Sequence, residues 1–396
     1  SERWSNTVRN NVIVAGARTP IARGRKGGLV SVDAWELARV VVPEVISRSG
    51  VDANDVDDIV RAENRQGGGV IARHTAVSLG LTGVPGMAVN RHCAAGQVAV
   101  QTAVGQIRSG VADVVIAGGT ESMSTMPFGV KMGADGTTTQ WMPSSHPNTA
   151  EAPAFDMAIT VGENTARLAG LTRRDVDEWA AYTHAQAIAS QDAGSFDAEI
   201  VPVTVTNADG STTVVSVDEH PRRGVTVESL GELKLLHPEI EGATVTAGNA
   251  AGVNDAAAAL MIASEDYANA HGLRALGTVV TWANVGVDPV ETGLAPISAI
   301  EKALGRAGLS IGDIDLWEIN EAFCAVPVAV TRKLGIDQSI TNVNGSGASL
   351  GHPIAATGAR MIVTMLGELA RRDASLGVVS MCAGGGMGAA MVIKRV

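Results

Sequence analysis

The chain has 396 residues and is 45% apolar, which argues against a disordered protein and allows two or three globular domains. Its formal charge of −11 argues against a nucleic-acid-binding protein, and three cysteines are too few for a disulfide framework. Because no apolar leader and no run of about 18 apolar residues occurs, we expect a soluble, cytoplasmic protein without a membrane span.

In the first 124 residues, predicted strands alternate with predicted helices. Asp33 is the expected N-cap of the first helix, and Gly50 is its expected stop. The strands are expected at 10–20, 56–62, 86–92 and 113–123, and the helices at 32–50, 71–81 and 94–110. We expect the strand at 86–92 to be buried. This alternation predicts parallel βαβ units.

The composition changes between Thr125 and Asp156, where Gly, Thr, Pro and Ser dominate without a period. We expect a long irregular excursion over the surface here, and loops of this length are often functional. Two helices are expected next, within 160–170 and 172–194, and then a hairpin that turns at Asp209-Gly210.

The alternation resumes in the last third of the chain. Helices are expected at 296–308 and 355–372, and strands at 313–319 and on both sides of the glycines in 376–396. The segment 341–385 repeats the order found in 87–119, namely strand, loop, small-residue helix, strand and Gly-Gly. This similarity indicates a duplicated α/β unit, although two unrelated βαβ units could share it by chance.

Cys93 and His352 are candidates for a nucleophile and its base. Cys93 opens a predicted helix, whose positive N-terminal end would favour the thiolate. His352 lies in a glycine-rich loop before the corresponding helix of the second half, so related halves would place the two loops opposite each other. The alternatives are an inert buried cysteine and an ordinary loop histidine.

Two further segments carry polar or reactive groups at predicted strand ends. Cys382 precedes three consecutive glycines, whose N–H groups could form an oxyanion hole or simply serve a turn with positive φ. Asn320 and Glu321 end another strand, where side chains would reach the crevice at the carboxyl ends of the strands. The glutamate could equally cap a helix.

Together these segments resemble the thiolase family over nearly the whole chain. The matching motifs are NRHCAAG, AGGTESMS, NEAF, NVNGSGASLGHPIAATGAR and CAGGGMGAA, and the segments 218–236 and 242–260 are similar to the family's coenzyme A region. The resemblance implies an α/β fold in which duplicated βαβ halves form five layers, αβαβα, with an inserted loop domain.

The resemblance also implies a domain organisation and an assembly. It implies an N-terminal half at 1–124 that is completed by about 251–275, a loop domain for coenzyme A at 125–250, and a C-terminal half at 276–396. A homodimer or homotetramer is implied, with acyl-CoA and CoA as substrates. No permanently bound cofactor, metal, nucleic acid or membrane partner is implied.

The implied activity is an acyltransferase of fatty acid metabolism, which catalyses reversible CoA-dependent Claisen condensation or thiolytic cleavage of 3-ketoacyl-CoA. Cys93 would be acylated, His352 would take its proton, and Cys382 would be the second acid/base. One oxyanion hole would be His352 with a water held by Asn320, and the other would be the N–H groups of Cys93 and Gly384.

The resemblance also implies residues for substrate binding, and one of them departs from the family pattern. The resemblance assigns Arg222 to the coenzyme, and it assigns Met157, Ala322 and Phe323 to the acyl and pantetheine pocket. Ala251 stands where the family often has a serine, which removes a hydroxyl from the coenzyme site. Each of these residues could instead be ordinary core or, for Arg222 beside Arg223, part of a solvated basic pair.

Two other departures concern the acyl pocket and its helix. Asp156 stands where short-chain members often have histidine, and MAITVGEN is one residue longer than the usual segment. Chain-length preference and reaction direction therefore stay open. The alternative functions are a ketoacyl-synthase-like condensing enzyme, which Cys382 disfavours, and a non-catalytic acyl-CoA-binding relative.

Overall fold

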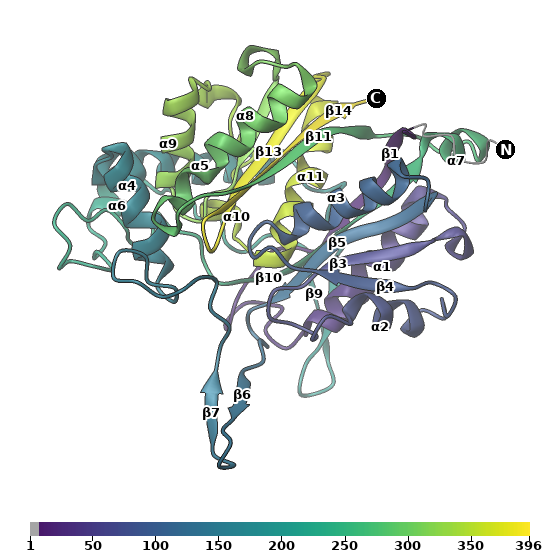
Figure 1. Ribbon diagram of the computed structural model, residues 1–396, viewed down its shortest axis with the longest axis horizontal. Coiled ribbons are helices and arrows are strands. Elements are labelled where there is room, and N and C mark those ends of the chain that lie inside the picture. The colour runs from purple at the N-terminus through teal and green to yellow at the C-terminus, as the bar shows by residue number, and fades with distance from the viewer. Residues whose placement is uncertain (1–7) are drawn as a thin grey trace.

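Two α/β halves make up the body of the computed structural model, which describes residues 8–396 (Figure 1). The nine longer strands of the body follow one hydrogen-bonded order, β12-β13-β14-β11-β1-β10-β5-β3-β4, and β2 adds to β10. Their bounds are β1 (Asn11–Arg18), β2 (Ala22–Arg23), β3 (Asp58–Ala62), β4 (Gly86–Val89), β5 (Val114–Ser122), β10 (Asn254–Ser264), β11 (Gly277–Gly286), β12 (Leu316–Ile319), β13 (Leu376–Ala383) and β14 (Met387–Arg395).

The pairing within each half confirms the predicted duplication. In the N-terminal half, β3 pairs parallel with β4 and β5, and β10 pairs antiparallel with β5 and β1. In the C-terminal half, β12 and β13 are parallel, while β14 is antiparallel to β13 and β11. Thr341 bridges Trp317 at the place that β4 holds in the first half. The halves join through β1 and β11, at Ile13 and Gly277.

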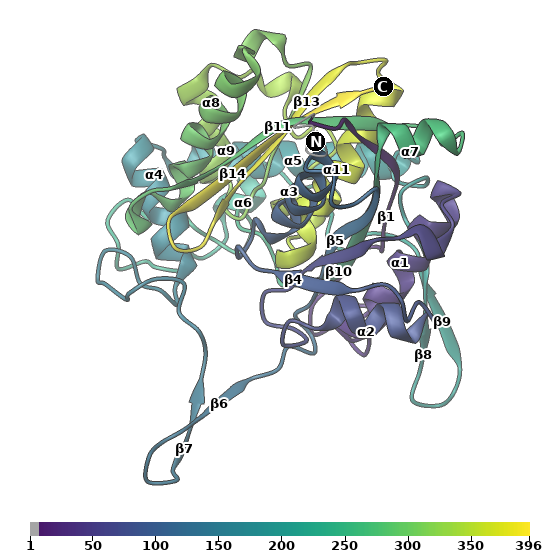
Figure 2. The ribbon, with the colours of Figure 1, turned by 45° about the vertical axis from the view of Figure 1, so that its right-hand side comes forward.

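Helices cover the outer faces of both halves of the sheet and fill the space between the halves, which confirms the five-layered α/β class (Figures 1 and 2). Helices α3 (Ala95–Arg108) and α11 (Ile354–Arg371) form the central layer. Helices α1 (Ala34–Ser49) and α2 (Ile71–Ser78) cover the outer face of the N-terminal half, and α8 (Ala295–Ala307) and α9 (Ala325–Leu334) cover that of the C-terminal half.

The predicted start and stop of α1 are confirmed. The Asp33 side chain accepts a hydrogen bond from the Glu36 N–H at 2.8 Å, and the Glu36 carboxylate accepts one from the Asp33 N–H at 3.1 Å. Gly50 ends the helix with φ of 73°, a conformation that other residues adopt only with strain.

The central helices approach each other at two glycines. A Cβ on Gly358 would lie 2.3 Å from the Gln97 nitrogen, and one on Gly96 would lie 2.7 Å from the Ala359 nitrogen. These obstacles are backbone atoms, which cannot move without shifting a helix. The crossing fixes the relation between the N-terminal ends of α3 and α11, where Cys93 and His352 lie.

We expect Gly358→Ala to lower the free energy of unfolding by about 3 kcal/mol, because the new methyl group forces the central helices apart. Gly105 provides a matched control within α3, since a Cβ there meets no atom within 4 Å. Gly105→Ala should stabilise the protein by about 0.5–1 kcal/mol through the lower entropy of its unfolded chain. Denaturant unfolding measures both, and equal effects would contradict the close crossing.

Two expectations about local structure are wrong. The stretch 125–156 is not wholly irregular, because β6 (Gly129–Met132) and β7 (Thr138–Trp141) form a hairpin that projects from the body (Figure 1). Both of its faces are exposed, so no apolar alternation marks it in the sequence. The strand at 86–92 is also less buried than expected, because β4 lies at the edge of the sheet.

The remaining elements surround the two halves. They are a π-helical segment (Ala158–Glu163), α4 (Asn164–Ala169), α5 (Arg173–Asp192), β8 (Val203–Thr206), β9 (Thr212–Val215), α6 (Val227–Gly231), α7 (Glu265–Ala270), α10 (Gly347–Leu350), and 3₁₀ turns at Ala53–Asp55, Pro289–Leu294, Ile311–Asp313 and Gln338–Ile340. The predicted hairpin at Asp209-Gly210 is confirmed as β8 and β9. The π-helical turn lies within the segment MAITVGEN.

A buried ion-pair cluster attaches the inserted segment to the N-terminal half. The Arg18 guanidinium at the end of β1 lies 2.7 Å from Glu199 and 2.8 Å from Asp218, and all three side chains are buried. The Asp218 carboxylate also accepts the Ile21 N–H at 2.8 Å. Because one cation satisfies two carboxylates from distant positions, this cluster fixes the path of the insertion over the first half.

Candidate active site

A cavity of about 500 Å³ lies where the two halves and the inserted segment meet. Eight of the ten residues that the sequence nominated line it, namely Cys93, Met157, Ala251, Ala322, Phe323, His352, Cys382 and Gly384. The other two, Asn320 and Arg222, are not on its wall. The cavity therefore gathers segments that lie almost 300 positions apart in the chain.

Cys93 lies in the turn between β4 and α3 and is half-buried. The backbone N–H groups of Cys93 and Gly384 lie near its sulfur and lower the pKa of the thiol. Burial nevertheless raises the pKa of the Cys93 thiol to about 11, and the nearby Glu121 carboxyl adds to this. Backbone N–H groups at the start of the helix do favour the thiolate, as expected, but desolvation outweighs them.

His352 lies between α10 and α11 with its imidazole buried. Its Nδ1 is 2.7 Å from the Thr357 hydroxyl, and that hydroxyl donates to the Pro353 carbonyl at 3.0 Å. Because the Thr357 proton is so engaged, we assign the ring proton of neutral His352 to Nδ1, which makes Nε2 the basic nitrogen. Within residues 8–396 no group bonds to Nε2. Burial and the Arg360 cation lower the pKa of His352 to about 4, so the ring is neutral near pH 7.

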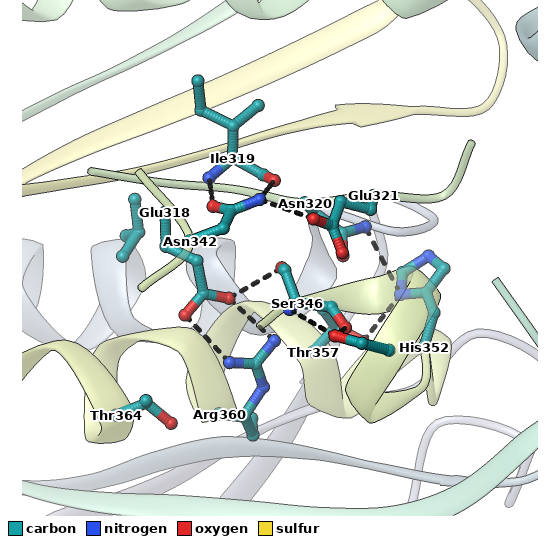
Figure 3. A network of polar contacts seen from close by, with 12 residues as sticks. Glu318, Ile319, Asn320, Glu321, Asn342, Ser346, His352, Thr357, Arg360 and Thr364 are labelled. Carbon is teal, nitrogen blue, oxygen red and sulfur yellow. Dashed lines mark hydrogen bonds and ion pairs between the residues drawn. The ribbon is translucent and has the colours of Figure 1, made fainter. Parts of the chain in front are cut away.

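Backbone contacts hold the His352 loop in place. The Asn254 side-chain oxygen accepts the His352 N–H at 3.0 Å, and Gly351 adopts φ of 106° against that amide. Asn320 follows β12, is fully buried, and has its amide nitrogen 3.5 Å from His352 Nδ1 (Figure 3). In the described part of the chain, the Asn320 side-chain oxygen has no hydrogen-bond partner. Asn320 thus contacts the imidazole from outside the cavity wall.

Glu321 supports the loop from behind. Its carboxylate accepts hydrogen bonds from the Trp179 indole at 2.7 Å, the Thr183 hydroxyl at 2.9 Å and the Asn342 amide at 2.9 Å, and from the Ala348 N–H at 3.2 Å. Burial raises its pKa to about 7 despite these donors. The carboxylate therefore anchors the loop that carries the imidazole and does not face the cavity as a reactive group.

A second carboxylate fixes the start of α11. Glu318 accepts hydrogen bonds from the Ser346 hydroxyl at 2.9 Å and from Arg360 at 2.9 Å, and all three side chains are buried (Figure 3). Breaking one partner of such a buried pair would leave an uncompensated charge in the interior. The network therefore ties β12 to the helix that positions His352.

Cys382 is the penultimate residue of β13 and is buried. Burial raises its pKa well above the ordinary range of a thiol, and the charge of a Cys93 thiolate raises it further. Cys382 and Cys93 line the same cavity. Neither thiol is ionised at neutral pH before substrate binds.

The wall of the cavity around Ala251 is built by backbone pairing. The Ala251 N–H donates to the Ala322 carbonyl at 2.9 Å, and Ala250 bridges Phe323. Ala251, Ala322 and Phe323 thus belong to one continuous surface, and Met157 at the start of the π-helical turn also lines the cavity. The alanine at 251 offers this surface no hydroxyl.

The structure places Arg222 away from the cavity wall. Its backbone N–H donates to His184 Nδ1 at 3.1 Å, while its side chain is exposed. The neighbouring Arg223 is bound by Asp192, with its guanidinium 2.5 Å from the carboxylate. Of the basic pair, only Arg222 therefore has a guanidinium without an ion-pair partner in residues 8–396.

Sequence reasoning missed several residues of the site. Thr357 and Asn254 orient His352, and Arg65, His92, Met142 and Ser145 line the cavity. His92 has φ of 46°, a strained conformation that no sequence pattern announces. The one signal in the sequence that could have identified His92 is that it directly precedes Cys93.

Residues 8–396 contain neither a membrane-spanning helix nor a metal-binding cluster. Among the described residues, no helix combines the length and the apolar character that a bilayer crossing requires. Among the same residues, no group of three or more His, Cys, Asp and Glu side chains is arranged to hold a metal ion.

Comparisons with known proteins agree with this geometry. Residues 11–266 match the family model of the thiolase N-terminal domain, and residues 273–395 match that of the thiolase C-terminal domain. Among curated relatives, the acetyl-CoA acetyltransferase of Cupriavidus necator is 40% identical, with 97% of this chain and 99% of the relative covered. That of Escherichia coli is 40% identical, with 98% and 100% covered.

Solved structures show the same likeness. The crystal structure of the Bacillus anthracis acetyl-CoA acetyltransferase has a TM-score of 0.92 and 38% identity, covering 99% of this chain and 100% of that one. Human mitochondrial 3-ketoacyl-CoA thiolase has a TM-score of 0.90 and 34% identity, covering 98% and 99%. These matches decide against the ketoacyl-synthase-like and non-catalytic alternatives, and the chain belongs to the thiolase family as an acyltransferase.

Proposed function

We propose that this thiolase uses Cys93 as the acylated nucleophile in the reversible, CoA-dependent cleavage and condensation of 3-oxoacyl-CoA. The observation that carries the proposal is the convergence of two thiols, one unprotonated imidazole nitrogen and two backbone N–H groups around one cavity. A covalent acyl transfer followed by proton transfer needs this set of groups.

In the cleavage direction, the Cys93 thiol gives its proton to His352 Nε2 as its sulfur attacks the 3-oxo carbon. The bond between the second and third carbons breaks, and the electron pair goes to the enolate of acetyl-CoA. Cys382 protonates that enolate. The thiol of a second CoA then gives its proton to the Cys382 thiolate and attacks the acyl group on Cys93. The departing Cys93 sulfur takes its proton back from His352, which restores both thiols and releases the shortened acyl-CoA.

Backbone N–H groups of Cys93 and Gly384 stabilise the oxyanion that forms at the carbon bonded to Cys93. Both N–H groups act on the Cys93 sulfur, to which that carbon is bonded, and this supports their assignment to the oxyanion. The enolate oxygen would be bound by His352 and by a water on Asn320, whose side-chain oxygen is buried and has no partner in the described chain. Loss of one such donor typically costs about 3 kcal/mol of transition-state stabilisation.

In the condensation direction, Cys382 removes a proton from acetyl-CoA while Cys93 carries the acyl group. A thioester at Cys93 has no charge, so the thiolate that would raise the pKa of Cys382 further cannot form at that stage.

The inserted segment 125–250 would bind coenzyme A. Met157, Ala322 and Phe323 offer an apolar surface for the pantetheine and acyl parts, continuous with Ala251. The exposed Arg222 guanidinium has no ion-pair partner in residues 8–396 and can serve a phosphate of the coenzyme. No cofactor besides the coenzyme substrate enters this scheme, and we place the enzyme in cytoplasmic fatty acid metabolism.

We also propose a homodimer or homotetramer. Strand β4 leaves one edge of the sheet open, and unprotected edges favour pairing with another chain. The hairpin β6–β7 exposes large apolar side chains, namely Phe128, Val130, Met132 and Trp141, on an arm that a monomer would leave in water. Light scattering of the purified chain measures the assembly, and a monomer would contradict this proposal.

Steady-state kinetics test the proposed reaction. With free CoA and methyl-terminated 3-oxoacyl-CoA of increasing chain length, we expect acetyl-CoA and an acyl-CoA shortened by one two-carbon unit. Chromatography of the CoA products measures both, and the chain length with the highest kcat/KM identifies the preferred acyl group. Absence of cleavage with 3-oxoacyl-CoA of every chain length and of either terminal group, methyl or carboxylate, would refute the proposal.

A further inference from the structure

The catalytic cavity contains an arginine that the proposed reaction does not use. Arg65 lines the cavity together with His92, which directly precedes the nucleophile Cys93. Its only side-chain acceptor among residues 8–396 is the Met142 sulfur, at 2.8 Å. A thioether is a weak acceptor, so most of the guanidinium donors are left for an incoming group.

The loop that carries Arg65 is closed and anchored on both sides of it. The Glu63 carboxylate accepts the Gly69 N–H at 2.5 Å and the Ile71 N–H at 2.7 Å. The Gln66 amide donates to Glu121 at 2.9 Å and to the Ser122 carbonyl at 3.1 Å. The guanidinium is therefore presented to the cavity from a loop of defined shape, which lowers the cost of binding an anion there.

Charges around Arg65 leave its cation uncompensated. Glu121 lies close enough for Arg65 to lower its pKa, but its carboxylate oxygens are occupied by Gln66 and the Ala355 N–H and make no ion pair with Arg65. His92 adds no negative charge, and burial, Arg65 and His146 lower its pKa. A fixed positive charge thus faces the cavity of a protein whose net charge is −11.

The position of Arg65 favours the acyl chain over the coenzyme as its ligand. Ala322 and Phe323, assigned above to the acyl and pantetheine surface, come from the C-terminal half, and Ala251 directly follows the insertion. Arg65 comes instead from the N-terminal half, beside the residue that precedes the acylated sulfur. An anion there would belong to the group that Cys93 receives.

The geometry points to a substrate whose acyl chain ends in a carboxylate, a 3-oxo-dicarboxylyl-CoA, with Arg65 as the residue that selects it. This inference rests on the proposed thiolase reaction. A planar guanidinium matches a carboxylate with two parallel hydrogen bonds, and such charge-assisted pairs are stronger than neutral ones. A methyl-terminated chain would leave the guanidinium unpaired and would gain none of this interaction.

The test compares substrates of equal length that end in a carboxylate or in a methyl group. The pairs run from 3-oxohexanedioyl-CoA against 3-oxohexanoyl-CoA to the ten-carbon homologues, each with free CoA. We expect Arg65→Met to lower the carboxylate-to-methyl ratio of kcat/KM by about 10- to 100-fold, because the charge-assisted bonds are lost. Arg65→Lys should lower it less, since lysine keeps the charge without the fork.

Arg39→Met is the matched control, because Arg39 is exposed on α1 and lies outside the cavity. The carboxylate-to-methyl ratio of kcat/KM for Arg39→Met should equal that of the unaltered chain. A ratio that Arg65→Met leaves unchanged would overturn the inference, and so would a raised KM for free CoA with both kinds of substrate, which would place Arg65 at the coenzyme. Failure to cleave any methyl- or carboxylate-terminated substrate would instead refute the thiolase reaction on which the inference rests.

Discussion

Cys93→Ala should lower kcat for cleavage of 3-oxoacyl-CoA by about ten-thousandfold, because no other group can carry the acyl intermediate. Of the three cysteines, Cys93 is the only one that is not fully buried, and two backbone N–H groups lie near its sulfur. Steady-state kinetics measure the loss, and intact-protein mass spectrometry should show no acetyl group after incubation with acetyl-CoA.

Cys324 supplies the control for that experiment. It is buried beside α9, away from the cavity wall, and Cys324→Ala should retain turnover and acylation. Iodoacetamide should modify Cys93 first, and acetyl-CoA should protect it. Because the pKa of Cys93 is about 11, the labelling rate should rise as the pH increases toward 11, through the growing thiolate fraction. Equal, slow labelling of all three cysteines would be inconsistent with a nucleophilic Cys93.

Cys382→Ser should separate the two chemical stages. We expect kcat to fall by about a thousandfold, since a hydroxyl is a far weaker acid than a thiol and general acid–base catalysis is worth roughly 10²–10⁴. Acylation of Cys93 by acetyl-CoA should persist, because that step needs His352 and the N–H groups but no enolate. Kinetics measure the first effect, and the mass of the acetylated protein measures the second.

Met381→Leu is the matched control on the same strand, because Met381 packs in the central cluster while Cys382 faces the outer one. A volume-conserving change there should leave both stages intact. If Cys382→Ser also abolished the acyl-enzyme, the division of roles between the two cysteines would be wrong.

Much of the fold could be predicted because its signals are local. The capped helix that begins after Asp33, the hairpin at Asp209-Gly210 and the repeated strand–loop–helix order are properties of short windows. The hairpin β6–β7 escaped prediction because both of its faces lie in water, so no alternation of polar and apolar residues marks its strands. The burial of β4 was also predicted wrongly. Its apolar residues suggested a buried strand, but β4 lies at the edge of the sheet and is partly exposed.

The candidate site likewise has features that the sequence predicts and features that only the structure shows. Motif order in the sequence nominated Cys93, His352, Cys382 and Gly384, and the structure gathers them at one cavity. The sequence could not reveal that burial raises the pKa of Cys93 to about 11 and outweighs the effect of the helix terminus. Nor could it find Arg65, because the charge of a side chain says nothing about whether the fold provides a counter-ion.

By itself, the sequence determined the α/β class, the duplication and the thiolase family, because periodicity and motif order survive without coordinates. Only the tertiary structure decided the ionisation of the thiols, the free nitrogen of His352 and the unpaired charge of Arg65 in the cavity. These properties depend on desolvation and on hydrogen-bond partners. The packing of segments from both halves and the insertion supplies both, and no single window of sequence contains them.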